Sequence, residues 1–196
     1  MSNTEKRRQQ TRTLVLGAVF TALVIVLQFL GAFIRFGMFS ISLVLLPIIV
    51  GAATCGYKIG AWLGFVFGVV VLLSGDATAF LTVNYWGTIV TVLVKGTLCG
   101  LVAGIVYKAL AKHNQYLAVM VAAIACPIVN TGIFLLGCNF FFLETIKGWG
   151  AAAGFNNVAA YMFLGLAGGN FLFELGTNLI LSPAVVRILK LTKIHS

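Results

Sequence analysis

Two ionisable side chains, Lys95 and Glu174, stand inside long apolar stretches of this sequence. An ionisable group at the depth of a lipid bilayer costs several kcal/mol, so such a residue is a functional candidate by default. Asn170 lies four residues before Glu174, which puts both on one face of a helix. Gln28 and Asn130 stand in two further apolar stretches. We expect these five side chains to converge on one cavity that opens to the outside and binds a small molecule.

A structural role for the same residues is the alternative. Lys95 and Glu174 would then form an ion pair, and the asparagines would link neighbouring helices through hydrogen bonds. Such a pair can coexist with a binding site above it, so the sequence leaves both interpretations open.

The motifs needed for catalysis or metal binding are missing from this sequence. The histidines, His113 and His195, stand in polar segments at their edges, and the sequence holds no HExxH motif. Intramembrane proteases of the metal or serine type need a histidine at membrane depth. The four cysteines form no CxxC pair, and there is no GxxxxGK[ST] phosphate-binding loop. We therefore expect no enzyme activity, no metal and no cofactor.

The composition is that of a protein built for lipid. Hydrophobic residues make up 61% of the 196 residues, charged residues make up 9%, and the mean hydropathy is +1.08. Soluble domains carry about 25% charged residues. The apolar segments continue to the C-terminus, so the first one is not a signal peptide ahead of a soluble domain. The predicted fold class is an all-α integral membrane protein with six transmembrane helices in one bundle.

The apolar segments give the positions of the six helices. Segment 13–33 carries no charge and is long enough to cross a hydrocarbon core of about 30 Å at about 1.5 Å per residue. Segment 41–55 is short and has Pro47 near its middle, so we expect a helix that is kinked, tilted or shielded by its neighbours. The remaining predicted helices are 59–73, 86–111, 115–143 and 158–189.

Basic residues gather on one side of this layout. Of the 13 lysines and arginines, ten fall on the side of the two termini: Lys6, Arg7, Arg8, Arg12, Lys58, Lys108, Lys112, Arg187, Lys190 and Lys193. By the positive-inside rule both termini are cytoplasmic. The chain then divides into a basic cytoplasmic lead (1–12), a transmembrane substrate-binding domain (13–190) and a cytoplasmic tail (191–196). Anionic lipid headgroups account for the net charge of +9, so we expect no nucleic-acid partner.

Small residues mark two helix faces. Gly60, Gly64 and Gly68 recur every four residues, which predicts the close approach of another helix backbone within the bundle. Ala18 and Ala22 form an AxxxA pair in the first predicted span. Spacing alone leaves open whether this pair packs inside the protein or docks on a second membrane protein.

The whole chain resembles the substrate-binding S component of energy-coupling factor (ECF) vitamin transporters. The resemblance lies in six helices within 200 residues, a basic N-terminus, the AxxxA face, and the stretch LPIIVGAATCGYKIGAWLGFVFGVVVLL at 46–73. The stretches KGTLCGLVAGIVYKAL (95–110) and PIVNTGIFLLG (127–137) are most similar to the pantothenate-type branch. That branch is expected to carry arginine near position 95, and lysine keeps the charge but lacks the bidentate geometry.

The resemblance implies a division of labour among subunits in a bacterial cell membrane. An S component binds one vitamin, and its partners, a membrane scaffold subunit and two ATPase subunits, supply the energy for uptake. The face of Ala18 and Ala22 is then the docking site for the scaffold. A free-standing six-helix carrier or channel is the alternative, which predicts inverted repeats or a polar pore. The sequence contains no convincing internal repeat.

The charged residues favour a substrate with a carboxylate, and pantothenate is the first choice. A desolvated carboxylate needs a charge-assisted partner, which Lys95 supplies, with Arg35 as a second positive group at the mouth of the cavity. Asn130 and Asn170 would hold amide and hydroxyl groups. Glu174, if paired with Lys95, would favour a neutral vitamin such as pyridoxine, and folate and riboflavin also remain open.

Two outer loops, 74–85 and 144–157, are expected to close over the substrate. Asn84, Tyr85 and Trp86 end the first loop, and the aromatic pair would cover the apolar part of the substrate. Small residues beside aromatic anchors are typical of a mobile lid.

Overall fold

The computed structural model describes residues 3–32, 35–36, 39–40 and 43–194, with side chains in the same ranges except 35–36, 39–40 and 190–194. In chain order the elements are α1 (Asn3–Ala32), β1 (Arg35–Phe36), β2 (Phe39–Ser40), α2 (Leu45–Cys55), α3 (Tyr57–Leu73), α4 (Thr78–Leu81), α5 (Tyr85–Leu110), α6 (Gln115–Phe141), α7 (Leu143–Ala152), α8 (Val158–Ala160), η1 (Tyr161–Gly168) and α9 (Gly169–Ile194). Strands β1 and β2 form an antiparallel hairpin. The chain is therefore a helical bundle, as predicted.

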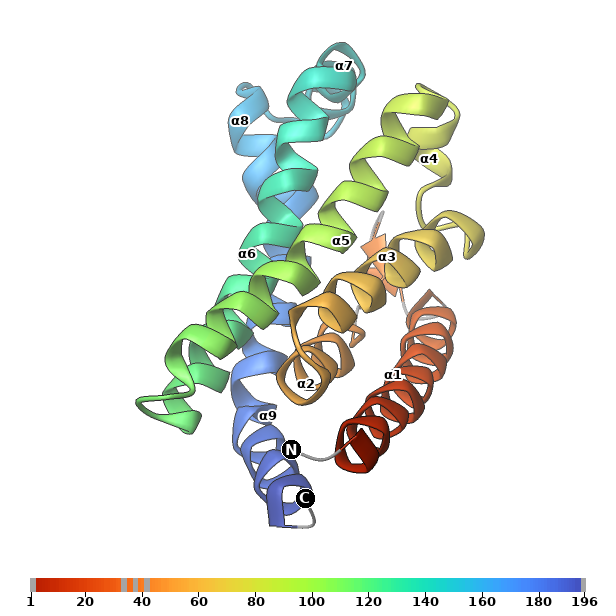
Figure 1. Cartoon of the computed structure of the whole chain (residues 1–196). Coiled ribbons are helices and arrows are strands. Elements are labelled where there is room, and N and C mark those ends of the chain that lie inside the picture. The colour runs from red at the N-terminus through yellow and green to blue at the C-terminus, as the bar shows by residue number, and fades with distance from the viewer. Residues whose placement is uncertain (1–2, 33–34, 37–38, 41–42, 195–196) are drawn as a thin grey trace.

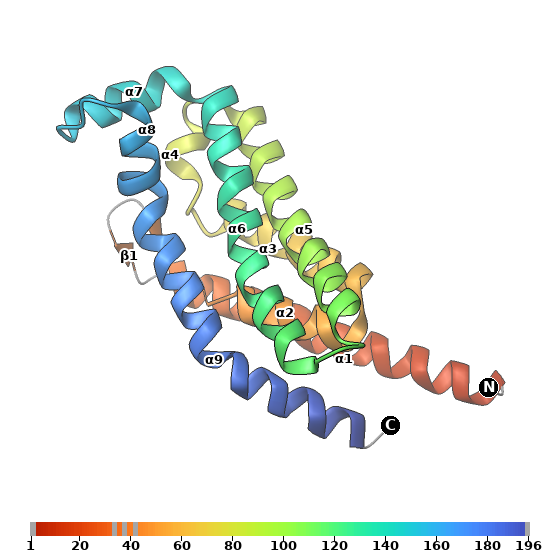
Figure 2. The ribbon, with the colours of Figure 1, turned by 90° about the vertical axis from the view of Figure 1, so that its left-hand side faces the viewer.

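The two ends of the bundle differ in what they hold. α1 begins and α9 ends at one end, where the turn between α5 and α6 also lies (Figures 1 and 2). The short helices α4, α7 and α8 lie at the other end. α4 (Thr78–Leu81) lies within the first segment predicted as an outer loop, 74–85, and α7 covers much of the second, 144–157, so both connections are partly helical. The start of α1 and the end of α9 thus lie at one end of the bundle, and the short helices lie at the opposite end.

A helix is present at each of the six predicted segments, but their lengths differ. Within the described residues, four helical segments are long and apolar enough to cross a membrane: Asn3–Ala32, Tyr85–Leu110, Gln115–Phe141 and Val158–Leu189. The first begins at Asn3, so the basic lead is the first part of α1. The sequence analysis expected this helix to begin at residue 13. Charged residues do not end a helix, because lysine and arginine have high helix propensity.

α2 is shorter than a membrane span because its neighbours shield it. It has 11 residues, and seven of them are buried: Leu45, Pro47, Ile48, Ile49, Val50, Gly51 and Ala52. A helix that faces protein on most sides does not have to match the thickness of the bilayer. Pro47 stands in the first turn, where its missing N–H costs no helical hydrogen bond. The expectation of a proline near the middle of this helix was wrong, and shielding rather than kinking explains its length.

The glycine stripe of α3 packs directly against the backbone of α5, as the spacing predicted. A Cβ atom at Gly60 would lie 2.5 Å from the carbonyl oxygen of Gly100, and one at Gly68 would lie 2.9 Å from that of Val92. A Cβ at Gly64 would overlap the carbonyl oxygen of Gly96. Only glycine permits this approach, and the contact fixes the position of α5 relative to α3.

The buried side chains form two hydrophobic clusters. The larger one surrounds α2 and includes Val24 of α1, Phe67 of α3 and Val92 of α5. The smaller one lies near α4 and α7 and includes Phe80 and Phe142. Ala77, just before α4, belongs to the first cluster and Phe80 of α4 belongs to the second, so this segment connects the two clusters.

The last of the four membrane-length segments, Val158–Leu189, contains a π-helical segment, η1, between α8 and α9. A Cβ at Gly168 would lie 2.6 Å from the carbonyl oxygen of Phe163, five residues earlier. Five residues is the hydrogen-bonding interval of a π-turn, so a side chain at Gly168 would collide with the widened backbone. The sequence analysis treated 158–189 as one regular helix. α9, which follows the π-helical segment, carries Asn170 and Glu174.

Candidate functional site

A cavity lies between the two hydrophobic clusters, on the side of α4. Its volume is about 80 Å³. Its polar lining residues are Gln28, Asp76, Thr88, Thr91, Lys95, Asn170 and Glu174, and its apolar lining residues are Phe67, Val71, Ala77, Phe80, Val92, Phe134 and Phe142. Aromatic walls with a few convergent polar groups are typical of a small-molecule site.

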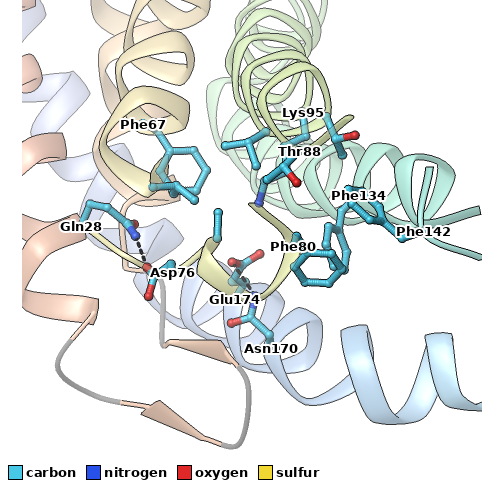
Figure 3. A pocket seen from close by; sticks show the side chains of 14 residues that line it. Gln28, Phe67, Asp76, Phe80, Thr88, Lys95, Phe134, Phe142, Asn170 and Glu174 are labelled. Atoms are coloured by element: carbon cyan, nitrogen blue, oxygen red, sulfur yellow. Dashed lines mark hydrogen bonds between the residues drawn. The ribbon is translucent and has the colours of Figure 1, made fainter. Parts of the chain in front are cut away.

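Four of the predicted residues line this cavity, and they reach it from three helices. Gln28 comes from α1, Lys95 from α5, and Asn170 and Glu174 from α9. Figure 3 shows Lys95 on the side of α5 and Glu174 with Asn170 on the side of α9. The four-residue spacing of Asn170 and Glu174 puts both on the cavity face of α9, as the sequence analysis expected.

Lys95 is held by aromatic rings. Its Nζ atom lies 5.5 Å from the ring centroid of Phe67 and 5.7 Å from that of Phe134, both within cation–π range. All four acidic residues of the chain are described, and none of them forms an ion pair with Lys95. The ion pair with Glu174 considered from the sequence is therefore not formed. The three N–H groups of the ammonium are available to an acceptor in the cavity.

Glu174 is almost fully buried and is held by two asparagines. Its side chain is 1% exposed. Nδ2 of Asn170 donates to Oε1 at 3.0 Å, and Nδ2 of Asn130 donates to Oε2 at 3.4 Å. Asn130 was expected to contact the substrate, but it does not line the cavity. It instead donates a hydrogen bond to the carboxylate of Glu174, which does line it. These hydrogen bonds compensate part of the cost of burying a carboxylate.

Asp76 is the main functional candidate that the sequence analysis missed. Nε2 of Gln28 donates to its Oδ2 atom at 2.6 Å, and Oγ of Ser74 lies 3.3 Å from the same oxygen. Asp76 thus ties the connection after α3 to the inner face of α1. It is one of only four acidic residues in the chain, and this scarcity in an apolar sequence was the available signal.

Thr88 and Thr91 were also missed, although their spacing pointed to them. They precede Lys95 by seven and four residues, so all three share one face of α5. Thr88 donates to the backbone carbonyl of Asn84 at 2.8 Å. The phenylalanines of the lining gave no signal, because the chain contains 16 of them.

Besides Asn130, three predicted site residues lie outside the cavity: Asn84, Tyr85 and Trp86. Tyr85 is 58% exposed and Trp86 is 73% exposed, and their rings pack edge to face with centroids 5.5 Å apart. α5 begins at Tyr85, and Trp86 stands two residues before Thr88, which turns it to the opposite side of the helix. Oδ1 of Asn84 caps the same helix by accepting from the backbone N–H of Gly87 at 2.9 Å. None of the three lines the cavity, and their expected contact with the substrate stays a prediction.

Arg35 cannot be placed in the site. It belongs to β1, but its side chain lies outside the described part of the structure. Its predicted role as a second positive group therefore stays a prediction.

The two small residues of the AxxxA pair face outwards. Ala18 and Ala22 are both exposed, whereas Gly17, Val24 and Gln28 on the other side of α1 are buried. A Cβ at Gly17 would lie 3.6 Å from Ile59, so this side packs on α3. The described residues therefore leave much of the surface of both alanines uncovered.

Comparison with known proteins gives two matches. The family model of the ECF transporter substrate-specific component matches residues 12–186. The pantothenic acid transporter PanT of Lactococcus lactis subsp. cremoris is 27% identical over 187 residues, which cover 86% of this chain and 89% of the relative. No solved structure matches the chain. The family whose model matches consists of substrate-specific components of transporters and is not an enzyme family.

Proposed function

Because this chain belongs to the family of ECF transporter substrate-specific components, we propose that it is the substrate-binding subunit of an ATP-driven vitamin importer and that its vitamin is pantothenate. Membership of the family and the apolar helices make it a membrane transport protein. The proposal adds the substrate, six membrane crossings with both termini in the cytoplasm, and a bacterial cell membrane as its location.

The observation that carries the substrate proposal is Lys95. It lies in a cavity with aromatic walls, and none of the four acidic residues forms an ion pair with it. A carboxylate entering this space gains charge-assisted hydrogen bonds that Lys95 does not make within the protein, each contributing roughly 1.5–3 kcal/mol. The name of the relative, a pantothenic acid transporter, supports the same choice.

A neutral vitamin such as pyridoxine is the second candidate. Among the described residues that line the cavity, two carboxylates, Asp76 and Glu174, accompany one ammonium, Lys95. If both are ionised, their field weakens the attraction for an anionic substrate.

Energy is proposed to come from a partner module of a membrane scaffold and two ATPase subunits. The exposed pair of Ala18 and Ala22 supports a docking site on α1, because small residues let another helix approach closely.

Three measurements test the proposal. Mass spectrometry of the purified protein identifies the vitamin that co-purifies, and calorimetry against pantothenate, pyridoxine, folate and riboflavin ranks their affinities. Uptake is then measured in cells with and without the ATPase subunits. Binding of another vitamin in preference to pantothenate would refute the substrate, and full uptake without the ATPase subunits would favour a free-standing carrier.

A further inference from the structure

Glu174 presents acceptors to the cavity. A carboxylate has about four lone-pair sites, and the amides of Asn130 and Asn170 each occupy one of them. About two sites remain without a hydrogen-bond donor from the described residues. Since the side chain is 1% exposed and lines the cavity, a molecule in the cavity is what can supply donors to them.

Lys95 presents donors from another helix. Its ammonium has three N–H groups, and the described residues offer it the rings of Phe67 and Phe134 rather than a hydrogen-bond acceptor. The cavity therefore has a donor side on α5 and an acceptor side on α9, as Figure 3 shows.

We infer that Glu174 determines specificity by selecting substrates that carry a hydroxyl or N–H donor away from their carboxylate. The carboxylate binds at Lys95, and the donors bind at Glu174. The reverse orientation would place two carboxylates together, which is unfavourable at low dielectric. This inference rests on the proposed function, and pantothenate meets the requirement because it has a carboxylate at one end and two hydroxyl groups at the other.

Glu174→Gln is a suitable test because the site can adjust to it. Glutamine keeps the shape but loses the charge and one acceptor. Oδ1 of Asn130 is buried without a hydrogen-bond partner among the described residues. If the side-chain amide of Asn130 rotates, this oxygen can accept a hydrogen bond from the side-chain N–H groups of the introduced glutamine. The control is Glu144→Gln in α7, where an exposed carboxylate pairs with Lys147 at 2.6 Å, outside the cavity.

Three ligands separate the two sides of the cavity. Pantothenate has both the carboxylate and the hydroxyl groups. Pantothenol, its neutral alcohol, lacks the carboxylate. N-pivaloyl-β-alanine keeps the carboxylate and the amide but has no hydroxyl group. Affinities are measured by calorimetry or competition on the full chain in nanodiscs, and thermal unfolding checks that each variant is folded.

The inference makes opposite predictions for the two sides. Glu174→Gln should weaken pantothenate and pantothenol about tenfold or more and change N-pivaloyl-β-alanine less than twofold. Lys95→Met should weaken pantothenate and N-pivaloyl-β-alanine and leave pantothenol within twofold. Glu144→Gln should change none of them. If Glu174→Gln does not fold, the wild-type protein still tests the donors, because equal affinity for pantothenate and N-pivaloyl-β-alanine would overturn the inference.

The outcomes distinguish this inference from the proposed function. Equal weakening of all three ligands by Glu174→Gln, or no change in any, would overturn the role of Glu174. Loss of pantothenol by Lys95→Met would overturn the orientation. Wild-type protein that binds pyridoxine but not pantothenate would refute the proposed substrate itself, and the orientation would fall with it.

Discussion

Replacing Gly64 by alanine tests whether the contact between α3 and α5 positions the cavity. A Cβ at this position would overlap the carbonyl oxygen of Gly96, and at the neighbouring Gly60 a Cβ would lie 2.5 Å from the carbonyl oxygen of Gly100. Ordinary contact begins at 3.4 Å, so the two helices have to separate by roughly 1 Å or more. The carbonyl oxygen belongs to the backbone and the Cβ atom is fixed to its Cα atom, so neither can rotate away as the end of a long side chain can.

The size of the effect follows from this separation. Overpacking of this kind costs about 1–3 kcal/mol, and each kcal/mol lowers Tm by roughly 2–4 °C for a chain of this size. Lys95 directly precedes Gly96, and Phe67 stands one turn after Gly64. The 5.5 Å distance between Lys95 Nζ and the ring of Phe67 must change when the helices move apart. We therefore expect Gly64→Ala to lower Tm and to weaken substrate binding several-fold.

The assay is thermal unfolding and calorimetry on the purified chain, with Gly132→Ala as the matched control. Gly132 also stands inside a helix, α6, but a Cβ there would meet nothing within 4 Å. Alanine should then keep or raise stability, because glycine is unfavourable in a helix by about 1 kcal/mol. Unchanged Tm and affinity in Gly64→Ala, or equal losses in both variants, would refute the reasoning.

Three further predictions concern the ligand, the partner and the lid. Lys95→Met should weaken binding of the carboxylate substrate at least tenfold, about 1.4 kcal/mol, in calorimetry against the vitamin panel, and unaltered affinity would remove Lys95 as the anchor. Ala18→Trp and Ala22→Trp should preserve binding in detergent but abolish uptake, because both side chains are exposed on α1, and equal loss of binding would point to internal packing instead. Saturating substrate should slow hydrogen exchange in 74–85 and 144–157, and unchanged protection would exclude a lid in these segments.

The features predicted correctly from the sequence depend on local spacing. Gly60, Gly64 and Gly68 lie on one face of any helix that contains them, so their close packing followed from the four-residue interval alone. Asn170 and Glu174 share a face for the same reason. The isolation of Lys95 in an apolar stretch marked it as a candidate, because lipid gives such a residue no other stable place.

The features that were missed depend on contacts between distant residues or on the first residue of a helix. Gln28 and Asp76 are 48 positions apart, and no periodicity connects them. The orientation of Tyr85 and Trp86 depends on where α5 begins and how it is rotated in the bundle. A shift of one residue turns a side chain by about 100°, and the uncertainty in helix ends predicted from sequence is larger than that.

The hydrogen bond between Gln28 and Asp76 links the cavity to the helix that carries the proposed docking face. Gln28 is 2% exposed and faces inwards, whereas Ala18 and Ala22 on the same helix face outwards. Asp76 belongs to the connection that precedes α4, and Phe80 of α4 lines the cavity. A partner that moved α1 by the length of one hydrogen bond would break the 2.6 Å hydrogen bond between Gln28 and Asp76 or displace Asp76, which lines the cavity. Because Gln28 stands on the helix that carries the proposed docking face, we expect docking on α1 and retention of the substrate to be mechanically coupled.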